Sequence, residues 1–190
     1  LAFVNTFVAT AAAALAWLFA EWGSKGKPSL LGGVSGVVAG LVAITPAAGF
    51  AHPGTAIILG AVASLICYFF VTTVKNKLKY DDTLDVFACH GVAGIMGAVL
   101  TGVFASKAVN PIGADGLLHG NPSLVGIQVL AVVATVAFAG TASFGILSAL
   151  KLVMPLRIRV DAEGQGIDLA EHGEEAYHGS DLSDLTGRRT

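Results

Sequence analysis

Charged residues are scarce in this chain. Only 13% of its 190 residues are Asp, Glu, Lys or Arg, whereas 54% are hydrophobic. Soluble domains carry about 25% charged residues. The uncharged residues form long continuous blocks, and residues 30–74 contain no Asp, Glu, Lys or Arg at all. Such blocks indicate helices that cross a membrane, because a hydrocarbon core of about 30 Å requires roughly 20 apolar residues of helix.

Several other signatures are missing as well. Strands of a membrane barrel alternate polar and apolar residues, whereas these blocks are continuous, so we expect an all-α membrane protein. No phosphate-binding loop, nucleophile elbow or zinc signature occurs. We therefore expect no enzyme, cofactor or metal site, and no nucleic-acid partner. The only two cysteines, Cys67 and Cys89, lie in apolar blocks, and we expect small buried side chains rather than a disulfide.

The apolar blocks predict a transmembrane domain over residues 1–154 with five transmembrane helices. Their predicted spans are residues 2–22, 30–50, 55–75, 84–106 and 123–154. Proline-containing breaks at Thr45-Pro46 and His52-Pro53-Gly54 divide the charge-free stretch into two spans. The chain opens in an apolar segment without an initiator Met or a basic leader, which indicates a fragment or a processed chain.

Basic residues alternate between the predicted loops. The first loop, the third loop and the segment after the last span are basic, whereas the second loop has no Lys or Arg and the fourth has only Lys107. By the positive-inside rule, the basic segments lie in the cytoplasm and the N-terminus lies outside. Residues 155–190 hold eight of the thirteen acidic residues, and we expect a cytoplasmic C-terminal tail. The chain is thus predicted to be a multi-pass protein of the cell (plasma or inner) membrane.

One histidine lies inside a predicted span. From a helix start near Thr83, His90 is expected roughly 12 Å into the membrane. An ionisable group at that depth is costly and commonly faces the interior of a helix bundle with a functional role. A core histidine satisfied by a backbone carbonyl is the alternative. Helical spacing places Val86, Gly94, Gly97 and Thr101 on the same face, which predicts a narrow and mostly apolar pore lining.

Carboxylates and glycines near this histidine allow two interpretations. Asp81, Asp82 and Asp85 precede the helix, where they can cap its N-terminus or support the mouth of a pore. Glycines recur within two of the spans, at residues 32, 36 and 40 and at residues 91, 94 and 97. They allow close helix packing, and some could instead leave room for a pore.

Four segments resemble, in order, motifs of the ammonium transporter (Amt/Rh) family. They are residues 5–13, 35–49, 81–95 and 166–177. The third segment carries D-V-F-x-x-H-G-x-x-G-I, which is similar to the tenth membrane helix of the family. The tail segment favours the Amt branch over the Rh branch.

The resemblance implies an eleven-helix fold built from two inverted halves and a final long helix, of which this chain holds helices seven to eleven. It identifies His90 as the second of two pore histidines, Val86 as pore-facing, and Asp82 as the counterpart of a buried aspartate in the first half. The first pore histidine is not in this chain.

The resemblance also implies an activity and partners. The family recruits ammonium outside the cell and conducts ammonia through a hydrophobic pore lined by histidine. It works as a homotrimer surrounded by membrane lipid, and a PII signalling protein blocks microbial members from the cytoplasm. The residues implied at the cytoplasmic mouth or in regulation are Asp85, Gly166, His172, Gly173, Glu174 and Tyr177.

Two other functions remain open. The chain could belong to an ammonium sensor that signals through its cytoplasmic tail. It could also be a truncated half that does not transport alone, because one half cannot enclose a pore.

Overall fold

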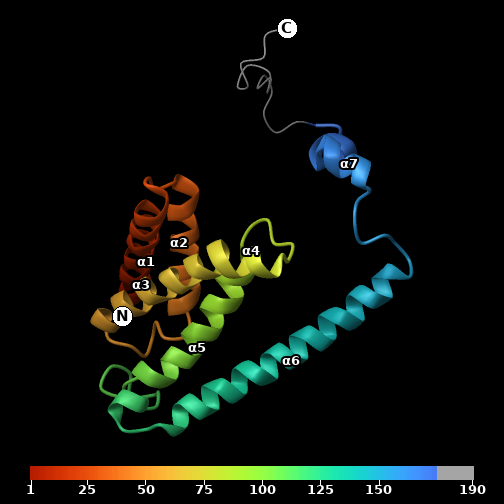
Figure 1. Cartoon of the computed structure of the whole chain (residues 1–190). Helices are drawn as coiled ribbons and strands as arrows, with labels where there is room; N and C mark the ends of the chain where they lie inside the picture. Colours follow the sequence, from red (N-terminus) through yellow and green to blue (C-terminus); the bar gives the residue numbers. More distant parts are fainter. Residues whose placement is uncertain (175–190) are drawn as a thin grey trace. The chain divides into compact units, whose positions relative to one another are not determined.

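A computed structural model describes residues 1–174, and within them all regular structure is helical (Figure 1). The all-α prediction is therefore confirmed. The chain divides into two compact units, Leu1–Ala137 and Phe138–Thr190. The elements, in chain order, are α1 (Ala2–Lys25), α2 (Leu30–Ile44), α3 (Pro53–Phe69), η1 (Phe70–Val74), α4 (Lys75–Leu78), η2 (Phe87–Val92), α5 (Ala93–Phe104), η3 (Leu117–His119), α6 (Ser123–Lys151), α7 (Val160–Gln165) and η4 (Asp168–His172).

Small residues form the core of the first unit, where α1 packs against both α2 and α3. A side chain at Gly36 or Gly40 of α2 would collide with α1 around Ala13. Gly60 of α3 lies directly against the backbone of Ala9. Close approach of backbones lets dispersion hold apolar helices together where the hydrophobic effect is weak. The glycines of α2 thus serve helix packing, one of the two interpretations of their spacing.

The second predicted span is shorter than expected. It was predicted over residues 30–50, but α2 ends at Ile44 and residues 45–50 form turns. Pro46 has no N–H to donate to the carbonyl of Val42, so the helix cannot continue through it. Asn5 of α1 holds the turn that follows, because its Nδ2 donates to the carbonyls of Ala48 at 2.8 Å and Ala51 at 2.7 Å.

The third predicted span is one continuous helical rod. It runs from Pro53 to Leu78 through α3, the π-helical η1 and α4. His52 caps its start, since His52 Nδ1 accepts the N–H of Gly54 at 3.3 Å. Pro53 at the first helical position has a φ angle already suited to the helix.

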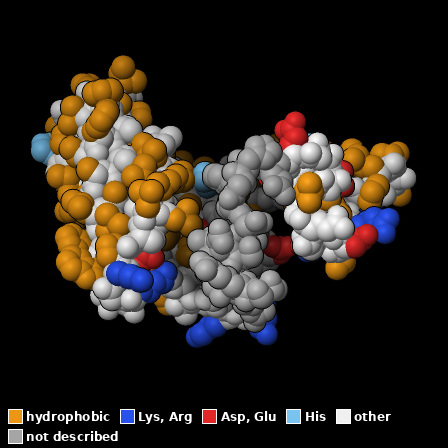
Figure 2. All heavy atoms as spheres, turned by 90° about the horizontal axis from the view of Figure 1, so that it is seen from above, with side chains coloured by type: hydrophobic (Ala, Val, Ile, Leu, Met, Phe, Trp, Pro, Cys, Tyr) orange, Lys and Arg blue, Asp and Glu red, His pale blue; other side chains and the backbone are white. Residues whose placement is uncertain are grey.

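The fourth predicted span begins later than expected. η2 and α5 together form the helix Phe87–Phe104, which replaces the predicted 84–106. Among the described residues, four helices are long and apolar enough to cross a membrane, and α2 is a shorter apolar helix of 15 residues. Figure 2 shows hydrophobic side chains spread over the outer surface, as a lipid-facing protein requires. Phe3, Phe7 and Phe19 of α1, for example, are all more than 60% exposed.

α6 runs for 29 residues and has no buried residue. Beyond it, in the second unit, the short helices α7 and η4 follow a stretch stabilised by exposed ion pairs. Arg157 lies 3.0 Å from Glu163, and Arg159 lies 3.0 Å from Asp161. The boundary predicted between membrane domain and tail, near residue 154, comes three residues after the end of α6. Its cytoplasmic location stays a prediction.

Candidate functional site

His90 lies near the beginning of its helix, in the π-helical turn η2. The helix begins at Phe87 rather than near Thr83, so His90 is about 5 Å from its start instead of roughly 12 Å. The predicted depth along the helix was therefore wrong. The hydropathy pattern did not reveal the true start, because residues 82–85 form a turn, closed by the N–H of Asp85 donating to Asp82 O, instead of the first turn of the helix.

The two sides of η2 differ in chemistry. Ala88 and Cys89 are buried, and the carbonyl of Ala88 accepts the Cys67 thiol of α3 at 3.1 Å. On the other side, the side chains of Val86 and His90 are exposed, Val86 by 48%. Within this chain, His90 therefore stands on an open face beside an apolar neighbour.

The face predicted to continue from His90 does not extend along α5. Gly97 packs against the carbonyl of Ala43 in α2, and Thr101 is buried with its hydroxyl donating to Gly97 O at 2.8 Å. A π-turn is wider than an α-turn. Residues three or four positions apart across η2 therefore do not lie on the same face of the helix. Gly97 and Thr101 were wrongly grouped with His90.

Gly94, in contrast, lies at the edge of a groove. With Ile95 and Ala98 it lines a cavity of about 250 Å³, and the other wall is formed by residues 131–136 of α6. A side chain at Gly94 would make only ordinary contact with Val42, so packing alone does not require glycine there.

Asp82 caps the helix that carries His90. Its two carboxylate oxygens accept the N–H groups of Val86 at 2.9 Å and Phe87 at 2.8 Å. Capping, one of the two roles considered for this residue, is thus observed. Burial and the nearby carboxylate of Asp82 raise the pKa of Tyr80 in the preceding loop.

Asp85 adopts a left-handed conformation, with φ of +56°, directly before the helix. Its carboxylate lies 2.6 Å from the Lys75 ammonium of α4. The ion pair joins the ends of the two helices on either side of the loop at residues 79–85.

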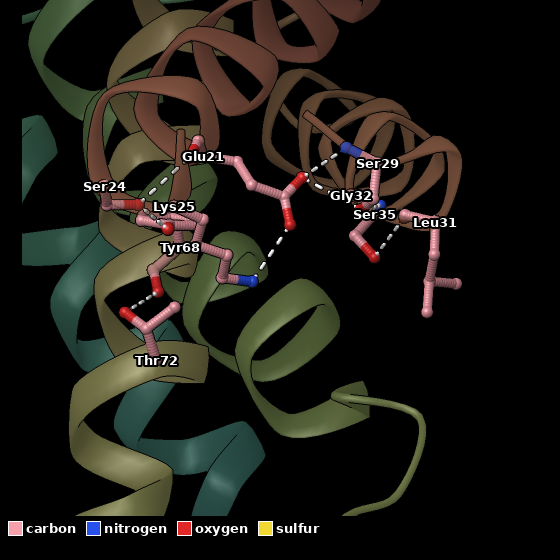
Figure 3. Close-up of polar contacts among 9 residues, drawn as sticks. All are labelled: Glu21, Ser24, Lys25, Ser29, Leu31, Gly32, Ser35, Tyr68 and Thr72. Atoms are coloured by element: carbon pink, nitrogen blue, oxygen red, sulfur yellow. Dashed lines mark hydrogen bonds and ion pairs between the residues drawn. The ribbon is translucent and has the colours of Figure 1, made fainter. Parts of the chain in front are cut away.

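A buried carboxylate at Glu21 was missed by the sequence analysis. Glu21 is only 4% exposed at the end of α1. Its Oε2 accepts both the N–H and the hydroxyl of Ser29 at 2.9 Å, and its Oε1 lies 2.9 Å from Lys25 Nζ (Figure 3). The hydroxyl of Ser29 in turn accepts the N–H of Gly32, which caps α2.

The surroundings of Glu21 join three helices. Ser24 of α1 shares a hydrogen bond with the phenol of Tyr68 in α3 (Figure 3). The Tyr68 ring meets Trp17 edge-on, with centroids 5.4 Å apart. Glu21, Tyr68 and Asp85 all line one cavity of about 150 Å³. A usable signal was present in the sequence, because Glu21 is the only acidic residue before Asp81.

The described tail residues implied by the resemblance are exposed and lie in or around η4. Gly166 and Gly173 take left-handed φ angles of +97° and +69°, which glycine adopts without strain. His172 ends η4, and the N–H of Glu174 donates to Asp168 O at 3.4 Å. Tyr177 lies outside the described residues. Among residues 1–174, no group of three or more His, Cys, Asp or Glu side chains could hold a metal ion.

Comparison with known proteins identifies the relatives of this chain. Residues 1–177 match the Ammonium Transporter Family. An ammonium transporter of Bacillus subtilis is 46% identical over 94% of this chain and 44% of its own length. One from Aquifex aeolicus is 52% identical over 93% of this chain and 41% of its own length. The chain therefore spans less than half the length of these relatives.

Solved structures show the same fold. The crystal structure of Candida albicans Mep2 is 38% identical, covers 95% of this chain and 41% of its own, and has a TM-score of 0.78. A structure titled "Sensor Amt Protein" is 26% identical over 90% of this chain, which covers 41% of it, with the same TM-score of 0.78. Together with the family match over nearly the whole described chain, these likenesses establish that the chain belongs to the ammonium transporter family.

Proposed function

We propose that this chain is the His90-bearing part of an ammonium transporter of the Amt branch. The family match over residues 1–177 carries the proposal. Relatives that share the match are named ammonium transporters and are more than twice as long. The complete protein, rather than this stretch of it alone, is the transporting unit.

Selectivity in the proposed pore rests on desolvation. Potassium and ammonium have similar size and equal charge, so a dry apolar conduit excludes potassium because it would lose water and gain nothing in return. Ammonium can release its proton and cross as ammonia. A neutral imidazole offers one donor and one acceptor to such a molecule, and a low-dielectric setting disfavours the charged imidazolium.

The open face of η2 supports this role for His90. Its side chain is exposed beside Val86, whereas the opposite side of the turn is buried against α3. We assign that open face to the pore, with its other wall and the first pore histidine supplied by the remainder of the complete protein. Asp82 caps the helix and also corresponds, in this second half of the fold, to the buried aspartate of the first half. Asp85 lies at the cytoplasmic mouth of the pore.

Assembly and regulation follow from the same family membership. The proposal includes a homotrimer in the cell membrane, a C-terminus in the cytoplasm and a block by a PII signalling protein. The tail residues assigned to that coupling are Gly166, His172, Gly173, Glu174 and Tyr177. Exposure of the described members of this set leaves them accessible to a cytoplasmic partner.

A sensor is the second candidate function. It is supported by the likeness to the structure titled "Sensor Amt Protein". A sensor would bind ammonium without substantial flux, whereas a transporter would conduct it. Flux from a reconstituted protein separates the two, and absence of flux from the chain alone would identify a half that needs the rest of the protein.

The experiment restores full length by joining this chain to the N-terminal part of a family relative. The chimera is placed in liposomes, and ammonium-driven and potassium-driven currents are measured. We expect ammonium flux, and we expect His90→Ala and His90→Glu to change the flux or the ammonium-over-potassium ratio. His52→Ala is the matched control, because His52 is exposed and caps α3 outside the proposed pore. An unchanged ratio in both His90 variants would defeat the assignment of His90.

A further inference from the structure

The salt bridge between Lys75 and Asp85 stands immediately before the helix that carries His90. The two charged atoms are 2.6 Å apart, and the side chains are only 25% and 23% exposed. Ion pairs with restricted access to solvent are screened less than those on an open surface. Lys75 belongs to the preceding helical rod, so the contact fixes one helix against the start of the next.

Asp85 needs such an anchor because its backbone is unusual. A residue other than glycine seldom occupies the left-handed region, although Asp tolerates it better than most. Residues with a strained backbone persist only where surrounding contacts hold them in place, and they are found most often at functional sites. Here the contacts are the Lys75 ammonium and a bond from Asp85 N–H to Asp82 O at 3.3 Å.

The conformation of Asp85 is transmitted directly to the neighbour of His90. The carbonyl of Asp85 accepts the N–H of Cys89 at 3.0 Å, which is the first rung of the helix. The direction of that carbonyl therefore sets how the first turn winds. His90 is the next residue, within the π-helical segment.

We propose that Lys75 is a positioning residue for His90. By holding Asp85 in its left-handed conformation, Lys75 orients the first turn of the helix and with it the imidazole. The inference rests on the proposed function of His90 as a pore residue and names a part of the machinery outside the pore itself.

The test uses the full-length chimera and compares Lys75→Met with Lys75→Arg. Methionine keeps the apolar stem of lysine and removes the charge, whereas arginine keeps the charge. Lys77→Met is the matched control, because Lys77 is an exposed lysine two residues further along the same short helix. The readout is the ammonium-over-potassium ratio, which does not depend on how many transporters fold.

We expect Lys75→Met to lower that ratio by about threefold or more, since small misplacements of a functional group are costly. Lys75→Arg and Lys77→Met should retain the ratio of the parent chimera. Asp85→Ala removes the same salt bridge from the other side, and alanine does not favour the left-handed region, so it should reproduce the fall even if the Lys75→Met protein folds poorly. Parent-like ratios in both Lys75→Met and Asp85→Ala, in a chimera where His90→Ala does alter the ratio, would overturn the inference. A chimera without ammonium flux, or one indifferent to His90→Ala, would instead contradict the proposed function.

Discussion

At the scale of single residues, Glu21 shows how an acidic side chain is accommodated in an apolar protein. Its two oxygens receive donors from Lys25 and from the backbone and hydroxyl of Ser29. A buried charge is tolerated when it is paired and hydrogen-bonded. Glu21 thereby fastens the end of α1 to the beginning of α2.

Glu21→Gln tests whether these contacts stabilise the junction of α1 and α2. The amide has one acceptor instead of a carboxylate's two oxygens and loses the charge opposite Lys25. We expect the free energy of unfolding to fall by about 1–3 kcal/mol, the cost of leaving a buried partner unsatisfied, with a lower melting temperature in detergent.

Lys25→Met is the control for that change. Lys25 supplies one of three donors to Glu21, and its side chain is 56% exposed, so water can partly replace its ammonium and its loss should cost less. A Glu21→Gln protein that melts with the parent would show that the network around Ser29 does not stabilise the α1–α2 corner.

His90 was predicted as a site residue from the sequence and Glu21 was not, for a physical reason. His90 stood out by lying within an apolar block and by its resemblance motif. Glu21 fell at the end of the predicted span 2–22, close to Lys25 and Lys27, where a charged residue near the membrane surface is ordinary. Burial of Glu21 depends on Ser29 folding back over the carboxylate, a contact that hydropathy cannot express.

At the scale of helices, α1 and α3 pack backbone against backbone, with no side chain between them at Gly60. A methyl group at Gly60 would overlap the carbonyl of Ala9. Gly60→Ala should therefore push the helices apart and destabilise the protein by about 1–3 kcal/mol, as overpacking does. Thermal unfolding of the purified chimera measures the effect.

Gly23→Ala provides the comparison, because a side chain at Gly23 of α1 meets nothing within 4 Å. It should be neutral or slightly stabilising, since alanine favours the helix by roughly 1 kcal/mol over glycine. Equal melting temperatures for Gly60→Ala and Gly23→Ala would contradict the close packing of α1 and α3.

Helix boundaries were predicted less well than helix identity. Apolar blocks located every long helix, since lipid permits few other structures. They did not reveal that α2 ends before Pro46 or that the helix of His90 starts at Phe87. The π-turn at η2 was also invisible, because its formation depends on tertiary contacts such as the one from Cys67 to Ala88. This turn is why the face predicted from regular helical spacing failed beyond Gly94.

At the scale of the whole molecule, the orientation in the membrane follows from the basic loops. Lys77 lies in a predicted cytoplasmic segment and Lys107 in a predicted external one. In intact cells, a membrane-impermeant thiol reagent should label Lys107→Cys and not Lys77→Cys. After the cells are opened, both should react.

The native cysteines limit the background of this experiment. Cys67 is fully buried and Cys89 is 4% exposed, so the parent protein should label weakly. Labelling of Lys77→Cys but not Lys107→Cys in intact cells would reverse the predicted orientation and place the tail outside.

The short α2 has a consequence for the lipid around it. Fifteen residues of helix extend only about 22 Å, less than the hydrocarbon thickness of an average membrane. The turn after Ile44 can occupy the remaining depth because Asn5 satisfies two of its carbonyls, as non-helical backbone there requires. Where α2 faces lipid, we expect any depth that this turn leaves uncovered to be matched by local thinning of the bilayer, so this corner of the protein should favour thin membranes.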